Sequence, residues 1–138
     1  MAIRSLAHVC LKTLDLDKTT EFYCGVLGLK KMFNFTRKGK IIGFYMKAEN
    51  ETFVEAFVEP EIEKLGKQVL NHFCLETDDV DALHQRVIAA GYTPDPIRLG
   101  ADGNRQFWMT DPNGLRIEFQ QYSEGCSQRA GGDVEATW

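Results

Sequence analysis

Two histidines and two glutamates of this 138-residue chain have side chains of the types that bind metal ions in proteins. His8 stands in AHVCLKTLDLD and His72 in NHFCLETDDVD, two stretches that share His, Cys, Leu, Thr and Asp at matching places. Glu55 in FVEAF and Glu118 in RIEFQ occupy equivalent places later in each half. Imidazole and carboxylate ligands suit divalent ions of intermediate hardness, such as Zn, Ni, Fe, Mn or Co. These four side chains are therefore predicted to hold one divalent metal ion.

Such an ion keeps positions open for a substrate, and a carboxylate beside it can move a proton on and off carbon. Glu118 and Glu55 are the candidate catalytic bases, and the repeat makes them nearly equivalent. The simpler interpretation is that the histidines are hydrogen-bonded core residues and that the glutamates point to solvent. The chain has only three histidines, however, and two of them coincide under the repeat, which favours the metal site.

An internal repeat must position these residues. Besides the histidine stretches, GFYM at 43–46 matches QFWM at 106–109. Each half reads as a strand, an amphipathic helix ending at glycine, and two or three further strands. The sequence thus predicts two similar modules, 1–62 and 63–124, within one structural domain, followed by a tail at 125–138. The charged linker around 60–68 is short, so the modules are expected to pack on each other.

The elements can be placed coarsely from the hydrophobic pattern. In the first half we predict a strand at 5–12, a helix capped by Asp15 or Asp17 and stopped at Gly28, and strands at 32–37, 40–48 and 52–59. In the second half we predict a strand at 69–76, a helix at 79–90, and strands near 105–110 and 115–122. The DPNG segment between the last two predicts a hairpin turn.

Composition narrows the function classes. With 16 basic and 20 acidic residues the formal net charge is −4, and a nucleic-acid binder would show a basic stripe instead. No apolar run approaches the ~20 residues that span a bilayer, so no membrane segment is expected. The N-terminal residues lack the pattern of a secretory signal. We therefore expect a cytoplasmic protein with four reduced cysteines.

Three segments together resemble the vicinal oxygen chelate superfamily, which includes glyoxalase I, extradiol dioxygenases, methylmalonyl-CoA epimerase, and fosfomycin and bleomycin resistance proteins. They are HVCLKTLDLDKTTEFYCGVLGL, NHFCLETDDVDAL and FWMTDPNGLRIEFQQ. The resemblance implies an α+β fold of two βαβββ modules whose curved mixed sheets surround a metal cavity. The family's ligand positions fall on His8, Glu55, His72 and Glu118, a set that is closest to glyoxalase I.

The resemblance implies a metal-dependent glyoxalase-like lyase or isomerase. Its substrate would be a small molecule chelated through vicinal oxygens, and a carboxylate would transfer the proton. The enzyme would be a homodimer, with its site within one chain or between two. The segment AFVEPEIEKLG after Glu55 departs from glyoxalase I, because it is acidic and lacks the family's Asn, and this disfavours glutathione as a cosubstrate.

Two alternatives stay open. An extradiol-type dioxygenase would hold Fe(II) with His8, His72 and Glu118. A non-catalytic resistance protein would bind a small molecule or antibiotic between aromatic walls, for which the candidates are Phe44, Tyr45, Phe107 and Trp108.

Several side chains are assigned secondary roles. Positive charge for an anionic ligand could come from Arg37 and Lys38, or from Arg98 and Arg105. Cys10 and Cys74 share the strand faces of the two histidines, and His84 is expected to be solvated. The polar tail needs a partner surface on the domain body or on a neighbouring chain.

Overall fold

The computed structural model describes residues 5–62 and 70–136, which form two compact units. The first contains residues 5–62 together with 112–114, and the second contains 70–111 and 115–136. Each unit has one strand, a helical segment and three further strands. The predicted α+β fold of two βαβββ modules is therefore confirmed. The predicted module boundary at 62/63 adjoins residues 63–69, which lie outside the described residues.

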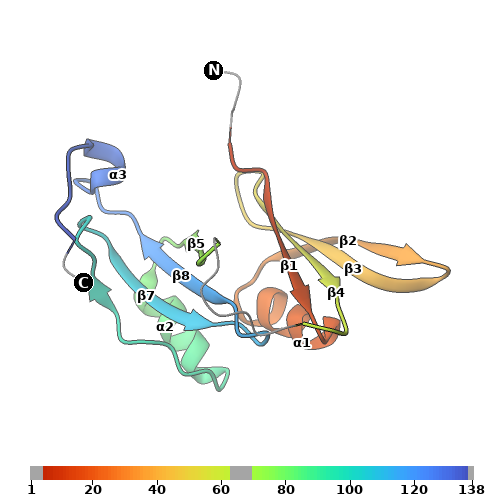
Figure 1. The fold of residues 1–138 in the computed structure, drawn as a ribbon. Coiled ribbons are helices and arrows are strands. Elements are labelled where there is room, and N and C mark those ends of the chain that lie inside the picture. Colours follow the sequence, from red (N-terminus) through yellow and green to blue (C-terminus); the bar gives the residue numbers. More distant parts are fainter. Residues whose placement is uncertain (1–4, 63–69, 137–138) are drawn as a thin grey trace. The chain divides into compact units, whose positions relative to one another are not determined.

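In each unit a four-stranded mixed sheet carries the same pairing (Figure 1). The first unit consists of β1 (His8–Thr13), α1 (Leu16–Thr20), the π-helical turn η1 (Glu21–Val26), β2 (Lys30–Arg37), β3 (Lys40–Lys47) and β4 (Phe53–Val58). Its strand order is β1-β4-β3-β2, with β1 parallel to β4 and the other pairs antiparallel.

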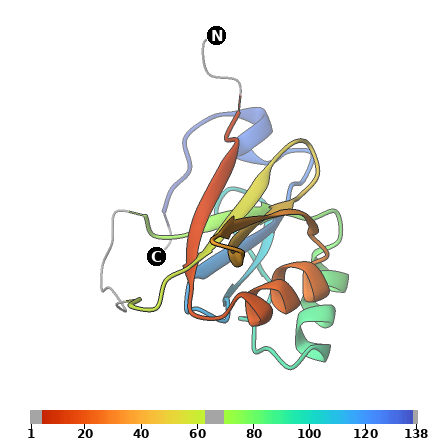
Figure 2. The ribbon, with the colours of Figure 1, turned by 90° about the vertical axis from the view of Figure 1, so that its right-hand side faces the viewer.

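The second unit repeats this plan. It consists of β5 (Phe73–Glu76), α2 (Val80–Ala89), β6 (Arg98–Leu99), β7 (Arg105–Thr110) and β8 (Arg116–Gln121), followed by α3 (Ser127–Ala130). The strand order is β5-β8-β7-β6, and again only the pair that includes the first strand is parallel. Within this unit α2 and α3 lie at opposite ends in both views (Figures 1 and 2).

Aspartates start both main helices. Of the two caps that the sequence left open, Asp15 is the one used, and its side chain accepts hydrogen bonds from the backbone N–H groups of Asp17 and Lys18. Asp79 caps α2 in the same way. The first helix was expected to stay α-helical to Gly28, but from residue 21 it widens into η1, which buries Phe22, Tyr23 and Val26.

Period-two alternation sorts each sheet into two faces. In the second unit Phe107, Met109, Ile117 and Phe119 are buried, together with Val80 and Val87 of α2. In the first unit the corresponding core residues are Leu11, Phe44, Met46, Val54 and Ala56. Residues between these positions point to the other face, and the candidate metal ligands are among them.

Three expectations need correction. Phe44 and Phe107 are fully buried core residues, so they line no binding surface. The strand expected at 69–76 is shorter, because pairing with β8 begins at Phe73; residue 69 lies outside the described residues. The two-residue strand β6 was not predicted, since Arg98–Leu99 is too short to show an alternating pattern.

The tail begins by packing on the second unit. Cys126 is fully buried, and the backbone N–H of Ser127 donates to the carbonyl of Asp102 at 3.0 Å. Gln128 accepts a hydrogen bond from Asn104 at 2.8 Å. None of the helices in the described ranges combines the length and apolar character needed to cross a bilayer.

Candidate metal-binding site

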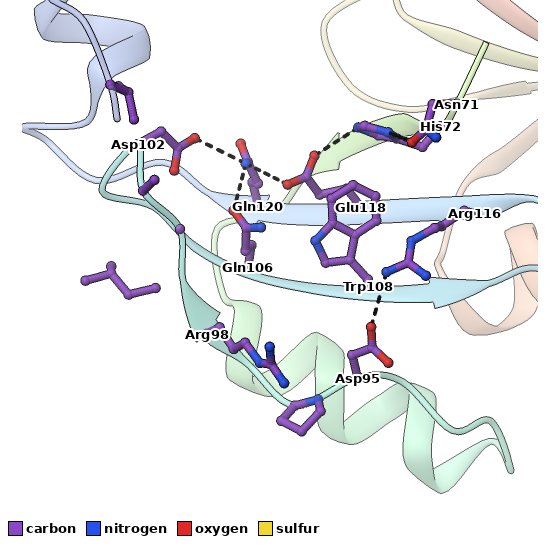
Figure 3. A pocket seen from close by; sticks show the side chains of 15 residues that line it. Asn71, His72, Asp95, Arg98, Asp102, Gln106, Trp108, Arg116, Glu118 and Gln120 are labelled. Carbon is purple, nitrogen blue, oxygen red and sulfur yellow. Dashed lines mark hydrogen bonds and ion pairs between the residues drawn. The ribbon is translucent and has the colours of Figure 1, made fainter. Parts of the chain in front are cut away.

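His72 and Glu118 form a close pair in the second unit (Figure 3). Glu118 lies on β8, and His72 directly precedes the neighbouring strand β5. The His72 Nε2 and Glu118 Oε2 atoms are 3.3 Å apart, and the two side chains are 32% and 10% exposed. The other ring nitrogen of His72, Nδ1, lies 2.8 Å from Asn71 Oδ1.

The Asn71 contact defines which nitrogen of His72 is available. An amide oxygen only accepts, so Nδ1 carries the proton and donates it to Asn71. In neutral His72 the lone pair of Nε2 then faces the carboxylate of Glu118, an arrangement that either a proton on Nε2 or a metal ion between the two atoms would stabilise. Two ligand atoms that each lie ~2.1 Å from one ion are about 3.0 to 3.5 Å apart. A strong charge-assisted hydrogen bond would be shorter, at about 2.8 Å. The spacing therefore fits a pair of metal ligands.

The first unit contains the equivalent pair. His8 lies on β1 and Glu55 on the adjacent strand β4. Their Nε2 and Oε2 atoms are 3.7 Å apart, with side-chain exposures of 43% and 15%. His8 Nδ1 lies 2.8 Å from the hydroxyl of Tyr45, which leaves Nε2 toward Glu55. A hydrogen bond to the second ring nitrogen is the usual way in which proteins orient a ligand histidine.

The surroundings of the two glutamates differ. Glu118 accepts a hydrogen bond from Gln120 Nε2 at 2.9 Å, and the same amide group contacts Gln106 Oε1 at 3.1 Å and Asp102 Oδ2 at 3.3 Å. The position equivalent to Gln120 in the first unit is Phe57, which offers no donor. Among the described residues, a side-chain amide therefore holds Glu118 but not Glu55.

A thiol lies beside each glutamate in the strand pairing, Cys10 opposite Glu55 and Cys74 opposite Glu118. Burial, together with the charge of Glu118 and a hydrogen bond to it, raises the pKa of Cys74 to about 12. Burial and Glu55 likewise raise the pKa of Cys10. Both thiols are thus protonated at neutral pH and serve as weak donors beside the carboxylates.

A cavity of about 810 Å³ opens on this face of the second unit (Figure 3). His72 and Glu118 line it, and Trp108 forms part of its wall. The Trp108 ring meets the His72 ring edge-on with centroids 4.5 Å apart, and the Arg116 guanidinium lies over it at 4.8 Å. Other lining residues include Asp95, Arg98, Asp102, Gln106 and Gln120.

The corresponding face of the first unit is aromatic. Tyr45 stacks on Phe33 with ring centroids 5.0 Å apart and also meets Phe35 and Phe53. Phe57 packs against Phe35 at 4.8 Å. Gly43 makes room for this ring, because a Cβ at that position would lie 2.5 Å from a Phe57 ring carbon.

The remaining predicted residues fall in different places. Arg105 pairs with Asp81 through two hydrogen bonds and does not line the cavity, whereas Arg98 does. Arg37 and Lys38 lie at the β2–β3 turn. His84 is not simply solvated, since its Nε2 lies 2.9 Å from the carbonyl of Asp95 and its ring packs edge-on against Phe107.

The residues that orient the candidate ligands were not predicted from the sequence. Gln120 could have been found, because it lies two positions after Glu118 and so shares its strand face. Tyr45 was named only as an aromatic wall, although its hydroxyl contacts His8. Asn71 has no counterpart in the repeat, since Ala7 stands before His8.

Each unit thus brings together one histidine and one glutamate. Within the described ranges no group of three or more His, Cys, Asp or Glu side chains is arranged to hold a metal ion.

Comparisons with known proteins support the family resemblance. The family model described as "Glyoxalase/Bleomycin resistance protein/Dioxygenase superfamily" matches residues 5–119. None of the curated proteins compared with the chain matches it significantly.

Three solved structures illustrate the similarity of fold. A glyoxalase family protein from Enterococcus faecalis has a TM-score of 0.74 at 20% identity, covering 87% of this chain and 99% of its own. A lactoylglutathione lyase from Agrobacterium tumefaciens has a TM-score of 0.66 at 21% identity, covering 88% and 96%. TnmS3, an antibiotic binding protein from Streptomyces sp. CB03234, has a TM-score of 0.70 at 22% identity, covering 89% and 99%. At these identities the likeness concerns the fold alone.

Proposed function

The chain belongs to the glyoxalase, bleomycin resistance protein and dioxygenase superfamily, and we propose that within it the protein is a metal-dependent enzyme of the glyoxalase type. His8, Glu55, His72 and Glu118 would bind one divalent ion. The reaction would be a lyase or isomerase step on a small substrate that carries oxygens on neighbouring carbons.

One observation carries the proposal. In each unit a histidine Nε2 faces a glutamate oxygen, at 3.3 Å for His72 and Glu118 and at 3.7 Å for His8 and Glu55. Both histidines have their other nitrogen engaged by a neighbour. Each pair supplies an imidazole and a carboxylate, and two such pairs make a common ligand set for Zn, Ni, Fe, Mn or Co.

The residues of the chain would have different roles in the reaction. A divalent ion bound by them supplies Lewis acidity toward the two substrate oxygens. Glu118 or Glu55 would take a proton from one carbon of the substrate and return it to the next. Trp108 packs edge-on against His72 and would restrict the access of water to that side of a bound substrate.

Metal titration tests the ligand assignment. Metal-free protein would be titrated with Zn²⁺ and Ni²⁺, alongside His8→Ala, His72→Ala and the control His84→Ala. We expect the original protein to bind about one ion per set of four ligands. The two ligand variants should bind the metal at least tenfold more weakly, and His84→Ala should bind it with the affinity of the original protein. If His8→Ala and His72→Ala both titrate like the original protein, the proposal is wrong.

Proton exchange tests the carboxylate base. Hydroxyacetone in D₂O would serve as a simple substrate carrying neighbouring oxygens, with its C–H signals followed by NMR. Metal-loaded protein should accelerate exchange, and Glu55→Gln or Glu118→Gln should reduce it. Undiminished exchange in both variants would remove the carboxylate base.

A binding function is the second candidate, and the aromatic face of the first unit favours it. Phe33 is 51% exposed there and stacks on Tyr45 at 5.0 Å, so a planar apolar ligand could lie on these rings. The similar structure TnmS3 is described as an antibiotic binding protein. Tight binding of a planar antibiotic to protein that takes up no metal would favour this function over catalysis.

We further propose a cytoplasmic homodimer. All four cysteines are free thiols, which suits a reducing compartment. Light scattering during size-exclusion chromatography would measure the oligomeric state. Mixing His8→Ala with His72→Ala protein would show whether one ion uses ligands of one chain or of two, because only shared sites regain binding in the mixture.

A further inference from the structure

Arg98 lines the cavity of the second unit without pairing with any residue that the structure describes. The carboxylates that line this cavity are all engaged: Asp95 with Arg116 at 3.4 Å, Glu118 with His72 and Gln120, and Asp102 with Asn104, Gln120 and Gln128. Arg98, by contrast, is exposed, and its guanidinium has no ion pair or hydrogen bond with any residue in the described ranges. The lining therefore presents one positive group without a partner.

The strand register places Arg98 in line with the site. Arg98 on β6 is paired with Gln106 on β7, which is paired in turn with Gln120 on β8. Directly paired residues point to the same face of a sheet, so the Arg98 side chain lies on the face of Glu118. Adjacent strands are ~4.8 Å apart, which puts the β6 backbone about 10 Å from the strand that carries Glu118.

The fold itself does not require a charge at this position. In the first unit the equivalent residue is Phe35, paired with Gly43 as Arg98 is paired with Gln106. Phe35 packs within the aromatic cluster there. The same sheet position thus holds an apolar ring in one module and a guanidinium in the other. The module folds with either side chain, so the positive charge of Arg98 has a role other than stabilising the sheet.

We propose that Arg98 binds the carboxylate of a small organic acid whose other end lies at His72 and Glu118. This inference rests on the proposed function and names its substrate class. A guanidinium binds a carboxylate through two parallel hydrogen bonds. A monoanion fits better than a doubly charged phosphate, because three carboxylates and two guanidinium groups line the cavity.

A pair of matched probes tests this assignment. 4-Carboxybenzohydroxamate carries a chelating end and a carboxylate across one ring, and 4-carbamoylbenzohydroxamate is its neutral analogue. Dissociation constants would be measured by calorimetry on zinc-loaded protein. Arg98→Gln and Arg98→Lys would be compared with Arg86→Gln, which removes an equal charge from the exposed side of α2.

We expect the acid to bind at least about tenfold more tightly than the amide, the scale of one charge-assisted hydrogen-bonded pair. Arg98→Gln should abolish this preference, Arg98→Lys should keep part of it, and Arg86→Gln should keep all of it. Equal binding of the two probes, or a preference that survives Arg98→Gln, would overturn the inference. Stronger displacement of the acid by inorganic phosphate than by acetate would overturn the choice of a carboxylate.

Benzoate and benzamide separate this inference from the proposed function, because neither carries the hydroxamate group that chelates the metal. Their affinities for metal-free protein therefore report on Arg98 alone. If the metal proposal fails, zinc does not increase the affinity for the neutral hydroxamate. Metal-free protein nevertheless binds benzoate more tightly than benzamide, through Arg98. If the Arg98 inference fails, zinc still strengthens binding of both hydroxamates equally.

Discussion

Gln120 donates a hydrogen bond to Glu118 at 2.9 Å, and Phe57 replaces it at the equivalent position beside Glu55. Glu118 is also the more buried of the two glutamates, with 10% of its side chain exposed against 15% for Glu55. The two halves therefore present the same ligand types in different surroundings. The Gln120 amide fixes one oxygen of Glu118 and directs the other toward His72.

Gln120→Leu should weaken both the fold and the metal site. The change removes the donor to Glu118 and leaves a nearly buried carboxylate without that partner, which costs about 1–3 kcal/mol in the free energy of unfolding. Loss of such an orienting contact typically lowers metal affinity about 10- to 100-fold. Urea unfolding and zinc titration would measure the two effects.

Gln85→Leu serves as the control, because Gln85 lies exposed on α2. If Gln120→Leu and Gln85→Leu have equal zinc affinity, the amide of Gln120 does not orient Glu118.

The thiol of Cys74 should react slowly with alkylating reagents. With a pKa of about 12, only about one thiol in ten thousand is ionised at pH 8, and the thiolate is the reactive form. Glu118→Gln removes the negative charge that helps to raise this pKa. We therefore expect faster carboxamidomethylation of Cys74 in metal-free Glu118→Gln protein, measured at pH 9 by peptide mass spectrometry.

Cys24 provides an internal reference for this experiment, since the causes of its raised pKa do not include Glu118. An unchanged ratio of Cys74 to Cys24 labelling would show that Glu118 does not hold the thiol protonated.

The features predicted correctly are those that depend on local pattern and on the repeat. Alternation grouped His8 with Cys10 on one face of the first strand but left open which face is inside. The repeat put His72 and Glu118 at positions equivalent to His8 and Glu55. That these four side chains bind one metal ion stays a prediction. Asp15 was one of the two caps expected for the first helix, and it was recognisable because a cap acts on its own helix within three residues. The cap at Asp79 was not predicted, although a helix was expected from 79 onward.

The features that were missed depend on contacts between elements. The sequence does not reveal that Tyr45 reaches His8 or that Gln120 also reaches Asp102, because the packing of separate segments decides both contacts. The contrast between an aromatic face in one unit and a polar cavity in the other was likewise missed. Seeing it requires knowing that Phe35 and Arg98 take equivalent sheet positions.

Asp102 should make the stability of the second unit depend on pH. Burial opposes its ionisation, but hydrogen bonds from Gln128, Asn104 and Gln120 outweigh this and lower the pKa of Asp102. A pKa below that of the unfolded chain means that the carboxylate stabilises the fold above about pH 4. This contribution is lost as the pH falls through the lowered folded-state value.

Asp102→Asn should therefore unfold at lower urea concentration than the original protein at pH 7, and the difference should shrink below pH 4. Asp133→Asn makes an equal charge change in the exposed tail, and it should unfold at the same urea concentration as the original protein at every pH from 7 to 3. A constant difference between Asp102→Asn and the original protein from pH 7 to pH 3 would contradict this role.

Thr13 connects the end of β1, the first helix and the DPNG turn. Its Oγ1 atom is fully buried with the side chain and lies 2.7 Å from both Thr19 Oγ1 and Asn113 Oδ1. It also accepts a hydrogen bond from the backbone N–H of Asp15, the residue that caps α1. Thr13→Val keeps the shape of the side chain but removes its hydroxyl, leaving these polar groups short of a partner.

We expect Thr13→Val to lower the free energy of unfolding by about 1–3 kcal/mol, because the groups it leaves unpaired are shielded from water. Thr36→Val is the matched control, since Thr36 is exposed on β2, where the β-branched valine is equally suited to a strand. Urea unfolding of the two variants would isolate the hydroxyl's contribution. Equal stability would mean that water replaces the lost hydroxyl and that the DPNG turn is held by its backbone alone.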